Sequence, residues 1–217
     1  MDSRGQTVKV IRNIYSMSGS ENKLADLVVG ACGWQHPQWL EAYYPEDLPE
    51  DWRLDYYSNE FGCVILPADL WMTTDGDVVE QWLDEAEEDF MFFLELPEQP
   101  ADAASKLSAF AGHCAGAVLL QGRAEDWQVI LGDIPLLQSE DTANLKRFYV
   151  TGRAEPVLVW LQAAAGEKIE LLALREQIET SLKGVSAPSR LAFVIGNEAP
   201  AMENLQNAKV LAELLGA

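Results

Sequence analysis

The chain has 217 residues and is poor in the residues that usually carry metal or thiol chemistry. It contains three cysteines, Cys32, Cys63 and Cys114, and two histidines, His36 and His113. The cysteines are odd in number and lack metal-ligand spacing, which is typical of a reduced, intracellular protein. Two histidines that share no motif do not form a histidine-rich metal site, so we expect no metal and no cofactor. An all-oxygen magnesium site remains open.

Positive charge is also scarce. The chain has 15 Lys and Arg residues against 35 Asp and Glu residues, a formal net charge of −20 and a pI near 4.3. From Leu54 to Ser105 it has no Lys or Arg at all. A surface of this kind repels phosphate backbones and anionic lipid headgroups, so we expect no nucleic-acid partner. We interpret the acidity itself as a contribution to solubility.

Long hydrophobic runs and nucleotide-binding signatures are missing from the sequence. No apolar run approaches the length that spans a bilayer, which excludes an integral membrane protein. The segment Val8–Ile14 is short and interrupted by Lys9 and Arg12, which argues against a signal peptide. No GxGxxG or GxxxxGK[ST] pattern follows an apolar segment. We therefore expect a soluble, cytoplasmic protein without a membrane partner.

The chain does have enough apolar residues, 48%, to fill the core of one α/β domain. Short apolar segments alternate with amphipathic ones, which predicts a mainly parallel sheet covered by outer helices. Periodicity alone does not separate a closed barrel from an open sheet. The predicted strands are Leu27–Ala31, Cys63–Leu66, Phe90–Leu96, Ala117–Leu120, Arg147–Val150, Val157–Leu161 and Leu191–Ile195. The predicted helices are Trp52–Glu60, Val78–Glu87, Ala103–Cys114, Lys168–Lys183 and Asn204–Leu215, while Glu125–Leu131 fits either state.

The two ends of the chain differ in organisation. Residues 1–26 form an N-terminal extension, in which VKVIRNIYSM fits an edge strand or a short helix. Residues 27–217 are expected to form a single domain.

A set of motifs in the stretch Leu27–Trp71 resembles the YecE-like family, domain of unknown function 72. The matching residues are Gly30, Gly33, Trp34, Trp39, Tyr44, Pro45, Leu48, Pro49, Tyr56, Tyr57, Phe61 and Val64. Near the C-terminus, Val157–Gln162 resembles the seventh strand of the family, and Asn197 with Asn204–Leu215 resembles its last strand end and closing helix. The resemblance implies a TIM-barrel-like fold and identifies the chain as a divergent and shortened member.

The chain departs from the family pattern at the positions that the resemblance places in the barrel mouth. These positions carry Cys32, Ile65, Pro67, Glu95, Trp160 and Gln162, where the family has Ser, Glu, Asn, Lys, Arg and His. Between the fourth strand and Val157 only about one barrel unit of chain remains, where the family has about two. We therefore expect a contracted or incomplete barrel that has lost most of its polar centre.

In an α/β barrel the functional groups sit where the strands end, at the C-terminal face. Three carboxylates follow predicted strands there, Asp69, Glu95 and Glu98, and they are the candidate catalytic acids or bases. The candidate ligand-binding residues are Cys32, Trp34, Gln121, Arg123, Gln162 and Asn197. Exposed rim charge is the alternative interpretation of these carboxylates.

Cys32 and the aromatic residues after it admit two interpretations each. Cys32 follows a strand and lies near His36, so a thiol–imidazole pair is conceivable, but a buried packing cysteine is the simpler explanation. The aromatic residues either form a stacking platform for a ligand or pack the first loop onto the barrel, and we favour packing. They are Trp34, Trp39, Tyr43, Tyr44 and Trp52.

Two classes of function remain from the sequence, and it does not decide whether the protein is an enzyme. The first is a non-catalytic barrel that binds a small molecule or a protein partner. The alternative is a metal-independent hydrolase or lyase that acts on a small neutral or cationic ligand, with Arg123 as its anchor. A nucleic-acid-related role, which the family suggests by analogy with barrel endonucleases, ranks third because of the net charge.

Overall fold

The structure is a computed structural model that describes residues 24–100, 103–141, 143–196 and 199–217. The expectation of an edge strand or helix in VKVIRNIYSM, and the candidate Asn197, lie outside the described residues.

Eight strands of the described chain form a closed barrel in sequence order, with β8 paired to β1. The strands are Asp26–Cys32 (β1), Cys63–Leu66 (β2), Met91–Glu95 (β3), Cys114–Val118 (β4), Leu136–Gln138 (β5), Leu145–Val150 (β6), Leu158–Leu161 (β7) and Arg190–Ile195 (β8). Six of the neighbouring pairs are parallel, whereas β6 is antiparallel to both β5 and β7. The prediction of a barrel with outer helices is confirmed, and its strands are mixed in direction.

We expected a contracted or incomplete barrel, and the ring is complete, so the second alternative is wrong. The chain is short here because the connections are short, while all eight strands are present. A parallel connection needs a long crossover, whereas an antiparallel one closes with a short turn. Reversing β6 lets residues 139–144 and 151–157 serve as its two connections. The short strand β5, which the sequence pattern did not reveal, completes the ring.

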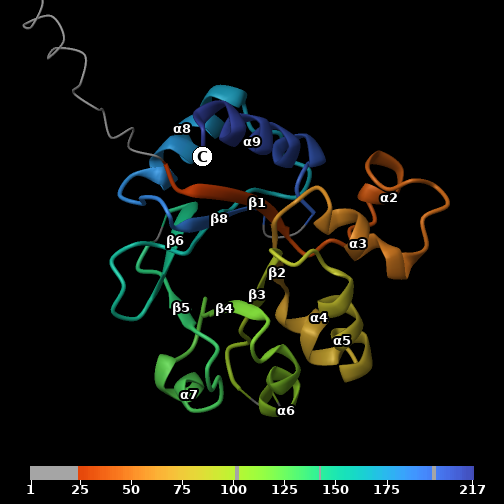
Figure 1. Ribbon diagram of the computed structural model, residues 1–217, viewed down its shortest axis with the longest axis vertical. Coiled ribbons are helices and arrows are strands. Elements are labelled where there is room, and N and C mark those ends of the chain that lie inside the picture. Colours follow the sequence, from red (N-terminus) through yellow and green to blue (C-terminus); the bar gives the residue numbers. More distant parts are fainter. Residues whose placement is uncertain (1–23, 101–102, 142, 197–198) are drawn as a thin grey trace, which may run out of the picture.

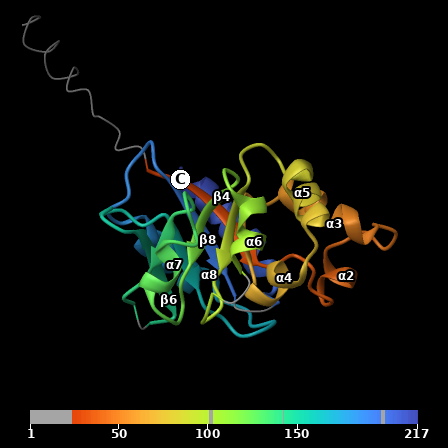
Figure 2. The same ribbon diagram turned by 90° about the horizontal axis from the view of Figure 1, so that it is seen from below.

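Helices cover most of the outside of the barrel (Figures 1 and 2). They are Trp39–Ala42 (α2), Arg53–Ser58 (α3), Ala68–Thr73 (α4), Gly76–Glu85 (α5), Ala103–Leu107 (α6), Ala124–Gln128 (α7), Leu171–Leu182 (α8) and Met202–Leu215 (α9). In Figure 1, α8 and α9 lie on one side, α2 to α5 on the next, and α6 and α7 on a third. The remaining side, beside β5 and β6, carries no helix in the described part of the chain.

Alternation along the strands divides the apolar residues into two clusters, because successive side chains point to opposite faces. The inner cluster fills the barrel with Cys32, Cys63, Ile65, Phe93, Val118, Leu137, Phe148, Leu158, Trp160, Ala192 and Val194. The outer cluster joins the other faces of the strands to the helices. The barrel is therefore a packed core and not a pore.

One glycine is required where β1 and β2 approach each other. A Cβ atom on Gly30 would lie 1.9 Å from the carbonyl oxygen of Cys63, far inside van der Waals contact. Only a residue without a side chain fits there.

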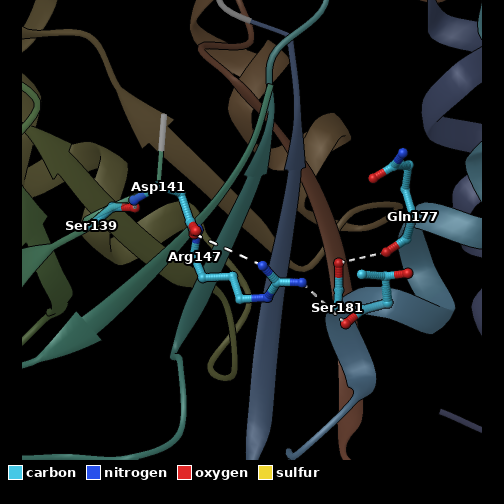
Figure 3. Close-up of polar contacts among 6 residues, drawn as sticks. Ser139, Asp141, Arg147, Gln177 and Ser181 are labelled. Atoms are coloured by element: carbon cyan, nitrogen blue, oxygen red, sulfur yellow. Dashed lines mark hydrogen bonds and ion pairs between the residues drawn. The ribbon is translucent and has the colours of Figure 1, made fainter. Parts of the chain in front are cut away.

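Arg147 ties the reversed strand β6 to a helix. Its Nη2 atom donates to the carbonyl oxygen of Thr180 in α8 at 3.4 Å, and its Nη1 atom lies 3.9 Å from the Asp141 carboxylate. Asp141 also accepts a hydrogen bond from the Arg147 backbone N–H at 2.8 Å (Figure 3). This brace takes the place of a covering helix on the outer side of β6.

Candidate functional site

Three candidate residues meet at the C-terminal mouth of the barrel. Cys32 ends β1, Glu95 ends β3, and Asp69 lies in α4 directly after β2. Burial raises the pKa of the Cys32 thiol, and the nearby charges of Glu95 and Asp69 raise it further. The three groups are therefore electrostatic neighbours, as expected for the ends of adjacent parallel strands.

Glu95 is the most distinctive of these residues. It alternates with Met91 and Phe93, which contact the inner cluster, so its own strand position faces the inside of the barrel. Burial raises the pKa of the Glu95 carboxyl, and the charge of Asp69 raises it further. Among the described residues, no Lys or Arg forms an ion pair with Glu95 or Asp69. Neither carboxylate therefore has a described Lys or Arg partner within ion-pair distance.

The backbone of Glu95 is fixed by a neighbouring indole. Trp71, which is fully buried in α4, donates its Nε1–H to the Glu95 carbonyl oxygen at 2.8 Å. The bond ties the helix that carries Asp69 to the end of β3, and so it fixes the spacing of the two carboxylates.

Large apolar side chains close the barrel beneath the carboxylates. Ile65 and Phe93 are fully buried, and Trp160 is 2% exposed. The Trp160 Nε1–H donates to the carbonyl oxygen of Gly196 at 2.6 Å, which locks the indole in place. A ligand at the mouth therefore meets a solid floor and can reach the rim only.

One inward-facing cation was not found from the sequence. Lys146 pairs across the sheet with Trp160, while Phe148 pairs with Leu158. Those three partners belong to the inner cluster, so Lys146, which is half-buried, lies on the inner side of β6. Because β6 is reversed, its first residues lie at the mouth. The direction of β6 is what places Lys146 at the mouth, and that direction cannot be read from the sequence pattern.

The residues after β3 and β4 lie on exposed loops that contact each other. Glu98, Gln121 and Arg123 are exposed, and a Cβ atom on Gly122 would lie 2.5 Å from the carbonyl oxygen of Glu98. The Arg123 Nε atom lies 3.7 Å from the carboxylate of Glu125, on its own helix α7. Arg123 is thus paired locally and does not neutralise Glu95 or Asp69.

Gln162 follows β7 and is half-buried. Its backbone N–H donates to the carbonyl oxygen of Asn144 at 2.7 Å, which extends the pairing of β6 with β7 toward the mouth. Its side chain is thus carried at the same end of the barrel as Glu95.

Trp34 packs outside the barrel and not in its mouth. It is 1% exposed and meets the ring of Trp82 edge-on, with 4.9 Å between the ring centroids. Its carbonyl oxygen accepts a hydrogen bond from the Tyr44 hydroxyl at 2.8 Å, and the Trp39 indole donates to Pro200 at 3.0 Å. These contacts support the packing interpretation of the aromatic cluster, apart from Trp52, which is 59% exposed.

His36 does not contact the Cys32 thiol. Its Nε2 atom lies 2.9 Å from the Cys32 carbonyl oxygen, which only accepts, so Nε2 carries the proton. Burial lowers the pKa of His36 and raises that of Cys32, so both groups stay neutral near pH 7. The arrangement supports a packing role for Cys32.

Two features are absent from the residues with described positions. None of their helices combines the length and the apolar character that crossing a membrane requires. No three of their His, Cys, Asp and Glu side chains lie close enough together to share a metal ion.

A closed ring of strands, outer helices and polar residues at the strand ends define the protein as an α/β barrel. Residues 28–125 match the family model described as "Protein of unknown function DUF72". The resemblance predicted from the sequence is confirmed over this part of the chain.

A solved structure supports the fold. It is that of a DUF72 family protein (TM1631) from Thermotoga maritima, to which the chain is similar with a TM-score of 0.51 and 14% identity. The similarity covers 87% of this chain and 99% of that one. No curated protein matches the sequence significantly.

Proposed function

We propose that this protein is a non-catalytic binding barrel that holds a small organic cation at the rim of its C-terminal mouth. The observation that carries the proposal is the position of Glu95, which faces inward above the closed floor formed by Ile65, Phe93 and Trp160. A packed interior is the rule in α/β barrels, whose sites are built at the strand ends above it. A rim site remains open to a ligand.

The charge of the rim selects the class of ligand. Glu95 and Asp69 have no described cationic partner, and each negative charge disfavours the other. A bound ammonium or guanidinium group would relieve that repulsion and donate charge-assisted hydrogen bonds to the carboxylates. An anion would meet the same repulsion and is not expected to bind there.

A thermal-shift screen of organic cations, neutral molecules and anions tests the proposal, because a ligand of the folded form raises its apparent stability. We expect alkylammonium or guanidinium compounds to raise the Tm, and the rise to disappear in Glu95→Gln. Glu125→Gln is the matched control, since Glu125 is exposed on α7 and is expected to leave the rise unchanged. Equal shifts in both variants would contradict the proposal.

A second candidate is a metal-independent hydrolase or lyase, and one observation favours it. Glu95 is half-buried with a raised pKa, whereas Asp69 is exposed, so one carboxyl could supply a proton while the other accepts one. Assays with chromogenic esters and glycosides separate the two candidates. Turnover that Asp69→Asn and Glu95→Gln each abolish would favour the enzyme and overturn the binding role.

We extend the proposal to the extent of the binding unit, its location in the cell and its partners. Residues 27–217 are proposed to act as one binding unit in the cytoplasm, without a nucleic-acid partner. The net charge of −20 opposes binding to a phosphate backbone. Retention of DNA by the protein on a filter at low salt would contradict the absence of a nucleic-acid partner.

A further inference from the structure

The outer surface of α2 and α3 exposes large apolar side chains to water. Trp52 ends the 3₁₀ helix Glu50–Trp52 that leads directly into α3, and it is 59% exposed. Tyr56 of α3 is 37% exposed, and Leu40 of α2 is 40% exposed. Side chains of this size usually gain stability by burial, so a group of them left in water marks a candidate contact surface.

These side chains lie next to one another. Trp52 and Tyr56 are four residues apart on one continuous helical segment, so they share a face of it. The ring of Tyr56 meets the ring of Tyr43 with 5.3 Å between the centroids, and Tyr43 follows Leu40 by three residues at the end of α2. Leu40, Tyr43, Trp52 and Tyr56 together form the α2–α3 surface. The two helices project from one side of the barrel in Figures 1 and 2.

The charge around the α2–α3 surface is negative and almost unopposed. Residues 24–105 contain 20 Asp and Glu residues but only one Lys or Arg residue, Arg53. Its Nη1 atom lies 4.0 Å from the Glu50 carboxylate, and its guanidinium carbon lies 6.0 Å from the centre of the Tyr44 ring. Five other carboxylates of this segment are exposed and form no ion pair with a described residue. They are Glu41, Glu46, Asp47, Asp51 and Asp55.

The combination of exposed aromatic rings and unopposed carboxylates determines which occupant fits. Phosphate groups and anionic lipid headgroups are repelled by this charge. A second copy that used the same surface would bring carboxylates against carboxylates, as a two-fold interface requires. Lys or Arg residues around an apolar side chain would complement both the charge and the aromatic rings, and Trp and Tyr contribute strongly to interfaces of this kind.

We propose that the α2–α3 surface binds a partner protein that presents Lys or Arg residues around an apolar side chain. Trp52, the most exposed of its aromatic residues, makes the central apolar contact. Asp51 and Asp55, one and three residues from Trp52, pair with the cations of the partner. None of these residues belongs to the barrel mouth, so the proposal does not depend on the function proposed above.

Three labelled peptides test the α2–α3 surface, with binding to the full chain measured by fluorescence anisotropy. The first is composed of Arg and Leu, the second replaces each Leu by Ser at equal charge, and the third replaces each Arg by Glu. We expect the Arg–Leu peptide to bind, the Arg–Ser peptide to bind at least about fivefold more weakly, and the Glu–Leu peptide not to bind. Equal affinity for the Arg–Leu and Arg–Ser peptides would assign the binding to general charge and overturn the proposal.

One variant tests the apolar contact. Trp52→Ser is expected to weaken the Arg–Leu peptide at least about fivefold and to leave the Arg–Ser peptide unchanged. Val129→Ser is the matched control, because Val129 is 89% exposed at the end of α7, which lies away from α3 in Figures 1 and 2. Equal affinities of the two variants for the Arg–Leu peptide would contradict the proposal.

A pair of double variants tests the charge. Asp51→Asn with Asp55→Asn is expected to weaken both Arg peptides at least about fivefold. Asp126→Asn with Asp133→Asn removes the same charge at exposed positions in and after α7, and it is expected to change their affinity less than about twofold. Equal weakening by the two double variants would place the binding elsewhere and overturn the proposal.

The chain's own N-terminal residues and a second copy are the competing occupants. Tighter binding of the Arg–Leu peptide to Lys9→Glu with Arg12→Glu would assign the α2–α3 surface to the N-terminal segment. A dimer in sedimentation equilibrium that Trp52→Ser dissociates would assign it to a second copy. Either result would overturn the proposal, whereas unchanged affinity and sedimentation that Trp52→Ser does not alter would support it.

Discussion

At the scale of single residues, the mouth of the barrel holds two carboxylates, Glu95 and Asp69, whose like charges repel each other. Glu95 faces inward, partly withdrawn from water; this burial raises its pKa, and the like charge of Asp69 raises it further. Such arrangements cost stability and are common at functional sites, where an uncompensated charge awaits a ligand. The residue that departs most from the family pattern in charge, Glu95 for Lys, is thus also the one that defines the chemistry of the rim.

The raised pKa of Glu95 predicts how stability changes with pH. The folded state binds the Glu95 proton more tightly than the unfolded state, so ionisation of Glu95 lowers the free energy of unfolding as pH rises through its raised pKa. We expect Glu95→Gln to have a higher Tm than the wild type at pH 7. The difference should vanish below about pH 4, near the pKa of an ordinary Glu. A lower Tm of the variant at pH 7 would contradict this account.

The cysteines are predicted to be unreactive in the folded protein. Burial raises the pKa of Cys114 to about 12 and raises those of Cys32 and Cys63 further, and the thiolate is the reactive form. We expect no modification by a disulfide reagent at pH 8 within an hour, and three modified thiols in guanidinium chloride. Rapid native modification that Cys32→Ser abolishes would show that the mouth is open.

At the scale of elements, the close approach of β1 to β2 restricts which residue fits at position 30. Gly30→Ala is predicted to destabilise the protein by more than about 3 kcal/mol or to prevent folding, because the new Cβ atom would overlap the Cys63 carbonyl. Gly76→Ala is the matched control, since nothing lies within 4 Å of its Cβ position at the start of α5. It should change stability by at most about 1 kcal/mol, toward greater stability. Urea unfolding of both variants measures the difference, and a wild-type midpoint for Gly30→Ala would contradict the register of β1 and β2.

The Arg147 brace is predicted to act locally. Arg147→Met removes the contacts with Asp141 and with the Thr180 carbonyl, but both charged side chains are partly exposed. We expect a loss of less than about 1 kcal/mol in unfolding free energy, together with faster hydrogen exchange in β6. Faster exchange spread evenly over all strands would argue against a local role.

Sequence patterns predicted strands well where turn residues bound them. The strand Cys63–Leu66 was placed correctly, because Gly62 precedes it and Pro67 ends it. The strand Leu136–Gln138 was missed, because three residues are too few for a pattern to appear. The direction of β6 could not be predicted either, since alternation looks the same in a strand and in its reverse. Direction depends on long-range pairing, which the local sequence does not contain.

At the scale of the whole molecule, closure of the ring explains where the candidate site lies. Closure brings Cys32, Asp69 and Glu95 together, as the rule for strand ends predicted from the sequence. It also places Lys146 at the same mouth, which depends on the reversed strand and could not be foreseen. The same reversal shortens the connections of β6. One change of strand direction thus accounts for the short connections of β6 and for the place of Lys146.

The filled barrel is proposed to bind an organic cation at the rim that carries Glu95 and Asp69. Calorimetric titration of arginine amide, a dication, into the wild type, Glu95→Gln and Glu125→Gln at pH 7 tests it most directly. The account predicts binding by the wild type, affinity at least about tenfold weaker in Glu95→Gln, and no change in Glu125→Gln. It also predicts that the wild-type affinity falls as pH is lowered through the raised pKa of Glu95. Absence of binding, or equal affinity in all three proteins, would contradict it.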